Sequence, residues 1–303
     1  MRLQHLHLLV ALSETGSLRA AAEVLNVTQP ALSKSLRQLE EEFGTTLVQR
    51  SAKGAHLGPA GELVAARAAT ALRELERAQE EVAWYLRHTS GLVTIGVSPA
   101  AAILLAPAAI ARFSARWPRV KVRVRDALYP NALRQLRAGE LDFAIGPLPI
   151  EGVGSDLVVQ ALFDSQDVIA ARQGHPLANA RRLAELAHAR WILTGPAGGP
   201  GDPVQLGFES LGLQTPAVHL ECESFSTLLG LMPTTDVVGI MPRGFFLRYG
   251  PRMGLVELPI EDPLPRISIH AVARADVRLT VPAQRLLDEF THIAKESEFG
   301  AHE

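Results

Sequence analysis

Two stretches of helical periodicity, separated by a short break, lie between residues 17 and 43. The apolar positions of the first stretch are Leu18, Ala21, Ala22 and Leu25. Those of the second are Leu32, Leu36, Leu39 and Phe43. Each set falls on one side of a helix, so each predicts a helix with one buried face. Ser17 and Thr28 stand where N-caps are expected, and Pro30 suits a first turn because an N–H there has no helical partner.

The opposite face of the second predicted helix is polar and carries no acid before Glu40. Its residues are Thr28, Gln29, Pro30, Ser33, Lys34 and Arg37. Amide and hydroxyl groups can read base edges, while lysine and arginine can contact bases or phosphates. An ordinary solvated helix has a similar face. Two short helices joined by a tight turn nevertheless favour a helix-turn-helix, in which the second helix reads DNA.

Short elements on either side complete this region. Before it, Leu3, Leu6 and Val10 predict a helix that stops at Gly16. After it, residues 47–57 have the pattern of strand, turn and strand, which is typical of a wing. Arg50 and Lys53 are the cations of that wing. We therefore expect a winged helix-turn-helix over residues 1–58.

The sequence around the break resembles the signature of the LysR-type transcriptional regulators, A-A-x-x-L-x-x-T/S-Q-P-A-L-S. The matching residues are Ala21, Ala22, Leu25, Thr28, Gln29, Pro30, Ala31, Leu32 and Ser33. Val48 departs from the phenylalanine usual in the family's wing, and Gly58 departs from its usual threonine or serine cap. The resemblance implies a DNA-binding regulator, and we expect its site to be an imperfect inverted repeat.

A long helical pattern follows from Pro59 to about residue 88. Its heptad-spaced positions are Gly61, Ala65, Ala68, Leu72, Leu75, Gln79, Val82 and Leu86. Such a seam is typical of two helices packed together, although a long helix lying on its own domain also buries an apolar stripe. The resemblance implies that residues 59–89 form a homodimer and that dimers assemble into a homotetramer.

From residue 91 onward the pattern alternates between strands and helices. Strands are predicted at 92–97, 120–125, 141–146, 168–171, 191–193, 218–221, 237–241 and 267–272, and helices at 100–117, 132–138, 183–187, 204–211, 225–231 and 282–295. This order predicts an α/β fold with mainly parallel sheets and helices on both faces. The resemblance implies a two-lobed effector-binding domain over residues 90–303, like the type II periplasmic binding proteins. Lobe I would comprise about 90–163 and 267–303, and lobe II about 164–266.

Ligands of open α/β sheets bind beyond the carboxyl ends of strands, where helices begin. By analogy with the family, the effector-binding residues are Ser98, Pro99, Ala100, Pro147, Leu148, Thr194, Gly198, Ser224 and Phe225. Helix starts at Ser98 and Ser224 offer free amides and a positive dipole end. We therefore expect a small organic anion, aromatic or short-chain, held by neutral donors because these segments contain no lysine or arginine.

Composition narrows the function further. The net charge is −2, and residues 1–58 carry a net charge of only +1, so DNA binding depends on the arrangement of cations rather than their number. The single cysteine, Cys222, excludes an internal disulfide. No apolar run is long enough to span a membrane. The sequence lacks a phosphate-binding loop, a nucleophile elbow and metal-ligand spacing, so we expect no cofactor and no metal.

Two other classes of protein share part of this pattern. A solute-binding protein would have the two lobes, but the N-terminal helices and the lack of a signal-peptide pattern oppose it. An enzyme on the two-lobed fold, such as a lyase of small aromatic compounds, needs a base or nucleophile with partners, and the sequence shows no such set. We expect a cytoplasmic transcriptional regulator that is not an enzyme. Its expected partners are double-stranded DNA, a small organic acid effector and RNA polymerase.

Overall fold

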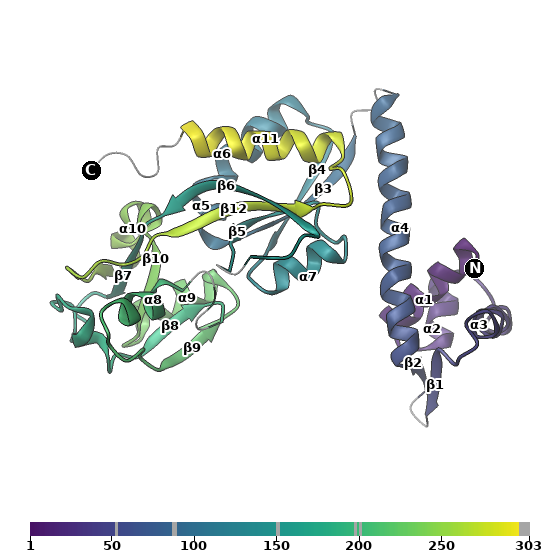
Figure 1. The fold of residues 1–303 in the computed structure, drawn as a ribbon, viewed down its shortest axis with the longest axis horizontal. Coiled ribbons are helices and arrows are strands. Elements are labelled where there is room, and N and C mark those ends of the chain that lie inside the picture. Colours follow the sequence, from purple (N-terminus) through teal and green to yellow (C-terminus); the bar gives the residue numbers. More distant parts are fainter. Residues whose placement is uncertain (52–53, 87–89, 150–151, 197–198, 200–201, 297–303) are drawn as a thin grey trace. The chain divides into compact units, whose positions relative to one another are not determined.

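The computed structural model describes residues 1–51, 54–86, 90–149, 152–196, 199 and 202–296. The chain forms two compact units. The first spans Met1–Leu86 together with Ala138–Glu140, and the second holds the other described residues. Each unit has its own hydrophobic core, and Figure 1 labels most of the elements of both.

The first unit consists of helices and a two-stranded sheet. Its elements are α1 (Leu3–Thr15), α2 (Leu18–Val24), α3 (Gln29–Phe43), β1 (Val48–Ser51), β2 (Gly54–Leu57) and α4 (Pro59–Tyr85). β1 and β2 pair antiparallel, which confirms the predicted wing. The helices predicted on either side of the wing are confirmed as well.

Local sequence determines where these helices begin and end. Gly16 and Gly44 follow α1 and α3 with φ angles of 63° and 65°, a conformation that glycine adopts without steric penalty. Thr28 caps α3 as predicted, because its Oγ1 accepts the N–H of Ala31 at 3.4 Å. Ser17 is the N-cap residue of α2, but its side chain makes no capping bond, so that part of the prediction is wrong.

Leucine side chains form most of the core of the first unit. Leu32, Leu36 and Leu39 of α3 are buried, and α3 packs on α1 and α2. Phe43 was expected on the same face but is 45% exposed. It is the last residue of α3, where the helix has passed the edge of the surface on which its leucines pack.

The apolar seam of α4 divides into two halves. Gly61, Ala65 and Ala68 are buried in the unit's own core, and α4 packs on α1. Leu75 and Val82, in the other half, are 49% and 59% exposed. The first half of the helix therefore lies on its own domain, which is the alternative that the heptad pattern left open. The second half keeps an apolar face without a partner among the described residues.

The second unit contains two five-stranded sheets, and we call the parts built on them lobe I and lobe II. Lobe I has the strand order β4-β3-β5-β12-β6 and lobe II the order β11-β7-β10-β8-β9. The elements of lobe I are β3 (Gly91–Val97), α5 (Pro99–Leu104), α6 (Ala106–Arg116), β4 (Val120–Asp126), α7 (Asn131–Arg137), β5 (Phe143–Pro147), β6 (Leu157–Ser165), β12 (Ile267–Arg274) and α11 (Val281–Glu296). Those of lobe II are β7 (Asp167–Arg172), η1 (Leu183–Leu186), β8 (Trp191–Thr194), α8 (Pro203–Ser210), β9 (Val218–Cys222), α9 (Phe225–Leu231), η2 (Met232–Thr234), β10 (Val238–Pro242), α10 (Arg243–Tyr249), η3 (Pro251–Met253) and β11 (Leu255–Glu257).

Both sheets are mixed, so the prediction of mainly parallel sheets is wrong. In lobe I, β3 pairs parallel with β4 and β5, whereas β12 pairs antiparallel with β5 and β6. In lobe II, β8 pairs parallel with β9 and β10, whereas β7 pairs antiparallel with β10 and β11. The sequence pattern did not indicate β6 or β11. The strands that enter from the other lobe arrive without a crossover helix, which a parallel neighbour would require.

Helices cover both faces of each sheet. In lobe I, α6 and α11 lie on one face and α7 on the other (Figure 1). In lobe II, Ile169 and Ala171 of β7 enter one core, and Val168 and Ala170 enter a second core on the opposite face. The helix predicted at 100–117 is two helices, α5 and α6, because Pro107 in the first turn of α6 cannot donate to the preceding helix.

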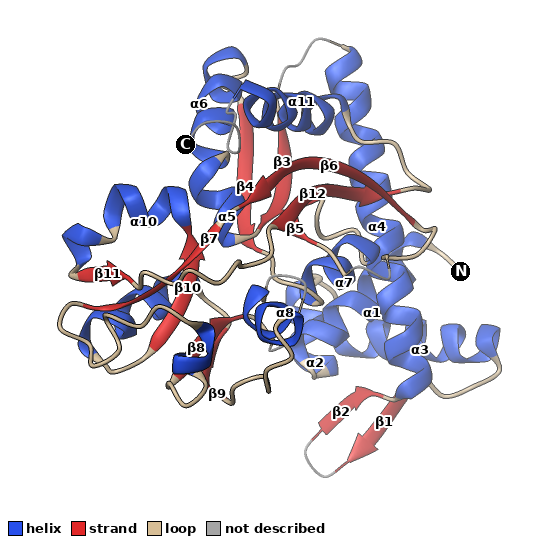
Figure 2. Cartoon of the chain, turned by 60° about the vertical axis from the view of Figure 1, so that its left-hand side comes forward, coloured by secondary structure: helices blue, strands red, loops and turns tan. Residues whose placement is uncertain are grey.

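The chain crosses between the lobes at two neighbouring places. β6 of lobe I ends at Ser165 and β7 of lobe II begins at Asp167, so only Gln166 separates the two strands. On the way back, β12 begins at Ile267, which pairs with Ser165. Figure 2 shows β6 and β12 side by side where they lead toward lobe II. The crossing therefore places Ser165 and Asp167 at the junction of the two sheets.

Gly61 provides a test of how α4 packs on the wing. A Cβ at this position would lie 2.1 Å from the carbonyl oxygen of Leu47. We predict that Gly61→Ala destabilises the first unit by about 1–3 kcal/mol because the backbone must shift, and urea unfolding would measure the loss. The matched control is Gly230→Ala in α9, where a Cβ meets nothing within 4 Å, so stability should stay equal or rise slightly. A Gly61→Ala protein as stable as the parent would contradict this packing.

Candidate functional site

The polar face of α3 is turned toward solvent. Thr28, Gln29, Pro30, Lys34 and Arg37 are exposed, and Ser33 is half-buried. The three buried leucines occupy the other side of the helix, so their packing decides which side chains point outward. Within the described part of the chain, neither Lys34 nor Arg37 forms an ion pair, and both cations therefore remain available to an anionic partner.

Glu40 connects the end of α3 to the wing. Its Oε1 accepts the N–H of Leu47 at 2.8 Å and the N–H of Val48 at 3.2 Å. The carboxylate is thus held at the base of the wing and does not neutralise the cations of the polar face. The predicted wing cations cannot be placed as fully: Arg50 lies in β1, but its side chain is outside the description, and Lys53 lies outside the described residues.

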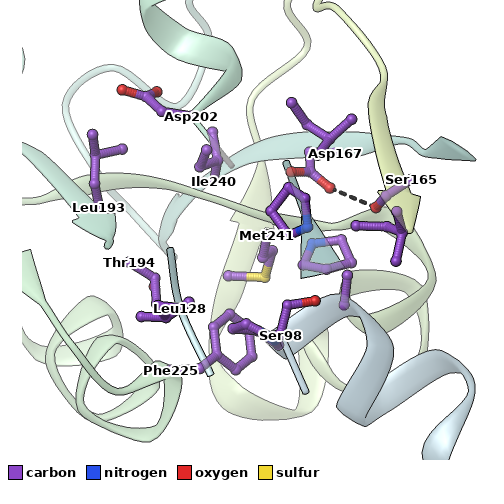
Figure 3. A pocket seen from close by; sticks show the side chains of 16 residues that line it. Ser98, Leu128, Ser165, Asp167, Leu193, Thr194, Asp202, Phe225, Ile240 and Met241 are labelled. Atoms are coloured by element: carbon purple, nitrogen blue, oxygen red, sulfur yellow. Dashed lines mark hydrogen bonds between the residues drawn. The ribbon is translucent and has the colours of Figure 1, made fainter. Parts of the chain in front are cut away.

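A cavity of about 70 Å³ lies between lobe I and lobe II (Figure 3). Six of the residues predicted to bind an effector line it, namely Ser98, Pro99, Ala100, Pro147, Thr194 and Phe225. They come from the ends of β5 and β8 and from the starts of α5 and α9. Residues far apart in the sequence are therefore brought together where the strands end, as expected for an α/β ligand site.

Two predicted effector residues lie elsewhere, and a third is not described. Leu148 packs with the core of lobe I, next to Leu133 and Tyr129. Ser224 is the N-cap residue of α9, but its Oγ lies 2.7 Å from the Oγ of Ser226 and does not line the cavity. Gly198 lies outside the described residues. The idea that the helix starts at Ser98 and Ser224 both face one ligand is therefore not supported.

Two hydroxyl groups of the lining are held in different ways. Ser98 is 2% exposed, its N–H donates to the carbonyl of Ile145 at 2.7 Å, and its Oγ accepts the N–H of Ala101 at 3.4 Å. The Oγ1 of Thr194 is buried and has no hydrogen-bond partner among the described residues. A buried hydroxyl without a partner is uncommon in a folded protein, so the Thr194 hydroxyl is suited to a bound ligand or water.

Asp167 places a carboxyl group in the cavity wall. Its Oδ1 accepts a hydrogen bond from the Ser165 hydroxyl at 3.0 Å (Figure 3). Burial raises the pKa of Asp167 from 3.8 to about 6, and the Ser165 bond offsets part of that rise. The carboxyl group is therefore mostly ionised at neutral pH. A second acid, Asp202, is 6% exposed and accepts the N–H of Val204 at 2.9 Å, which caps α8.

The charges of this lining weigh against the expected anionic effector. Asp167 and Asp202 are its titratable groups, and no lysine, arginine or histidine is among the described residues that form it. A carboxylate ligand here would lie close to the Asp167 carboxylate, whose described partner is the neutral Ser165 hydroxyl. The hydroxyls of Ser98 and Thr194 remain as neutral donors, as the sequence indicated.

Other kinds of chemistry have little support in the described residues. No group of three or more His, Cys, Asp or Glu side chains in the part of the chain that the structure describes is placed to hold a metal ion. Cys222 is buried at the end of β9, outside this cavity, and burial raises the pKa of its thiol, which lowers its reactivity. None of the described helices combines the length and the apolar character that a membrane span requires.

Two family descriptions match the chain. The bacterial regulatory helix-turn-helix protein, lysR family, matches residues 3–62, and the LysR substrate binding domain matches residues 86–294. The chain belongs to the LysR family of transcriptional regulators. It is a DNA-binding regulator with a substrate-binding domain, and the relatives it matches are transcriptional regulators rather than enzymes.

Individual relatives extend over most of the regulator. It is 27% identical over 285 residues to the transcriptional regulator TdcA of Escherichia coli (strain K12). The aligned residues make up 94% of this chain and 91% of TdcA. It is 33% identical over 260 residues to GbpR of Azospirillum brasilense, covering 83% of this chain and 74% of GbpR. The structure of full-length CbnR with its target DNA has a TM-score of 0.73 and 19% identity, covering 98% of this chain and 100% of that one.

Sequence reasoning missed most of the residues that complete the regulator's cavity. They are Leu128, Ser165, Asp167, Leu193, Asp202, Ile240, Met241, Pro242, Ile267 and Ile269. Ser165 and Asp167 escaped notice because β6 was not predicted, so the Ser-Gln-Asp segment did not read as a crossing between lobes. The signal that could have revealed this crossing is the short polar segment directly before the apolar run 168–171.

The raised pKa of Asp167 predicts a pH-dependent stability. Between about pH 4 and pH 6 the folded regulator holds the Asp167 proton more tightly than the unfolded chain, so stability falls as pH rises through this window and stays lowered above it. We predict that Asp167→Asn raises the melting temperature at pH 7.5 and that its advantage shrinks as pH falls to 5 and below. Asp164→Asn, which changes an exposed acid of β6, is the control. An advantage that is the same at both pH values would contradict the burial of this carboxyl group.

Proposed function

We propose that the regulator binds an imperfect inverted repeat in double-stranded DNA and that a small organic effector bound between lobes I and II controls this binding. The observation that carries the DNA part is the exposed polar face of α3, which lies opposite the buried leucines of the same helix. In a helix-turn-helix this second helix enters the major groove with its first residues nearest the bases.

The side chains of that face have distinct roles in the proposal. Gln29 and Ser33 contact base edges, because an amide and a hydroxyl can both donate and accept hydrogen bonds. Lys34 and Arg37 contact phosphates, at least in part, and hold the register of the helix on the duplex. Thr28 and Pro30 shape the start of the helix beside the DNA, and Arg50 and Lys53 of the wing add phosphate contacts.

A dimer follows from the second half of α4. Leu75 and Val82 are exposed there, and a groove beside them is also lined by Leu3 and His7 of α1. A second copy of α4 would cover this apolar surface, and Gln79 within it would fix the register. A twofold dimer matches the symmetry of an inverted repeat. The proposed assembly is two such dimers joined through their effector domains, as the family resemblance implied.

Effector control follows from the position of the cavity beside the two crossings. A ligand that contacts both lobes stabilises the arrangement in which they are closed on it and shifts the population toward that state. The proposal is that this shift changes how the DNA-binding units of the assembly are spaced. We place the regulator in the cytoplasm, with DNA and RNA polymerase as its macromolecular partners.

Two substitutions in α3 test the DNA interface. Arg37→Ala should weaken binding to all sequences and reduce the slope of log affinity against log salt by about one, because one phosphate contact is lost. Gln29→Ala should reduce the preference for the specific site by about 1–3 kcal/mol, because a base contact is lost. Gel shifts with upstream and scrambled DNA over a salt series measure both. The control Arg285→Ala removes an exposed arginine from α11. If Gln29→Ala preferred the specific site over scrambled DNA as strongly as the parent does, Gln29 would not contact a base.

Two lysines placed in the exposed half of the α4 seam test the dimer. Leu72 is partly packed on the unit's own core, so Leu75→Lys with Val82→Lys is the cleaner choice. The double variant should give a smaller particle in light scattering, because a dimer would bury two charges from each protomer in an apolar seam. Leu63→Lys, also on α4 and 65% exposed, should leave the mass unchanged. A double variant with the parent's mass would show that α4 is not the dimer contact.

A further inference from the structure

The polar groups of the interlobe cavity indicate which class of effector it takes. Asp167 stands at the junction of the lobes, as the first residue of β7 and directly after the crossing at Gln166. Its register partner across the sheet is Pro242, another residue of the cavity wall. Figure 3 shows Asp167 and Ser165 on one side of the cavity, with Ser98 and Phe225 on the other. A ligand between the lobes would therefore lie within reach of this carboxyl group.

The charge of Asp167 is not matched by a cation of the described protein. Among the described residues its carboxylate accepts a hydrogen bond from the Ser165 hydroxyl, a neutral donor that binds a single oxygen. The arginine that follows β10, Arg243, donates to the carboxylate of Glu257 at 2.8 Å instead. Holding an ionised carboxylate away from water without a cation is unfavourable. A positively charged ligand group would remove that penalty when it binds.

Three helix starts around the cavity, those of α8, α5 and α9, do not provide an alternative anion site. The first amides of α8 face the carboxylate of Asp202, which accepts the N–H of Val204. At α5, the Oγ of Ser98 already accepts the N–H of Ala101. The Ser224 side chain at the start of α9 is turned to Ser226 and is absent from the lining. At these helix starts an anionic ligand would find few free donors, and it would lie close to the Asp167 carboxylate.

We propose that the effector carries a positively charged nitrogen, such as an ammonium group, which binds the Asp167 carboxylate while its apolar part lies among Phe225, Met241 and Ile269. This inference rests on the proposed function, since it takes the cavity to be the effector site. The hydroxyls of Ser98 and Thr194 are placed to bind a further polar group of the ligand, because the Thr194 hydroxyl has no partner among the described residues. The cavity of about 70 Å³ favours a compact organic amine.

The test uses the full-length protein and two matched sets of small molecules. One set is isobutylamine, isobutanol and isobutyrate, and the other is benzylamine, benzyl alcohol and benzoate. Each set keeps a similar apolar body and changes the charge of its polar end. We expect an amine to raise the melting temperature in a concentration-dependent way, and we expect the alcohol and the carboxylate of the same set to have little effect.

Variants then locate the bound amine. Asp167→Asn should weaken its apparent affinity at least about tenfold, because a charge-assisted hydrogen bond is lost. Asp164→Asn removes an exposed acid three residues away, outside the cavity lining, and should bind the amine as the parent does. Circular dichroism of both variants checks that the fold is retained. An amine that binds Asp167→Asn as tightly as the parent overturns the proposal, as does a lack of binding by both amines.

The outcomes separate this inference from the proposed function. If a carboxylate binds and Ser98→Ala abolishes that binding, the ammonium proposal is overturned while the cavity remains the effector site. If the amine binds through Asp167 but gel shifts with and without it show the same DNA affinity and complex mobility, the ligand class is supported and the control of DNA binding by this cavity is overturned.

Discussion

The burial of both faces of strands such as β3, β7, β8 and β10 in the second unit is the constraint on which its ligand chemistry depends. β7 shows it most directly, because its alternate residues enter two different cores. A strand packed on both sides has no room for polar side chains along its length. Polar groups that can bind a ligand are left at the strand ends and at the crossing between the lobes. Ser98, Thr194 and Asp167 all occupy such positions, and they line one cavity although they are far apart in the sequence.

The same logic acts in the first unit through a helix instead of a sheet. Burial of the α3 leucines leaves the polar face of that helix exposed, and the Glu40 carboxylate is held by two amides at the base of the wing. The cations of the face are consequently not neutralised by the acidic end of their own helix. This explains how a region with almost no net charge can present a surface suited to DNA.

The charged side chains of α3 and those of the interlobe cavity differ in their exposure to solvent. On α3, Lys34 and Arg37 are exposed, where solvent screens them and an anionic partner can reach them. In the cavity, Asp167 is half-buried, and the partial loss of water around its carboxyl group raises its pKa to about 6. A charge with little water around it discriminates more strongly between ligands than an exposed charge does. Few water molecules can stabilise it when an oppositely charged ligand is absent. The predicted helix starts at Ser98 and Ser224 favoured an anionic effector, whereas the acid in the wall of this cavity underlies our proposal of a positively charged one.

The sequence by itself determined the order and type of most elements. Leucine spacing and the Thr28 cap sufficed for α3 because a helix of this kind depends on residues three or four apart. The resemblance carried the two-lobed plan and six residues of the cavity, Ser98 and Phe225 among them. Only the tertiary structure decided three other matters: which half of the α4 seam is buried, how the strands that link the lobes run, and that Asp167 joins the cavity. Each depends on contacts between residues distant in the chain, for which local periodicity holds no signal. The acid of the cavity was invisible in the sequence for that reason, since its environment is built by lobe I, lobe II and the crossing together.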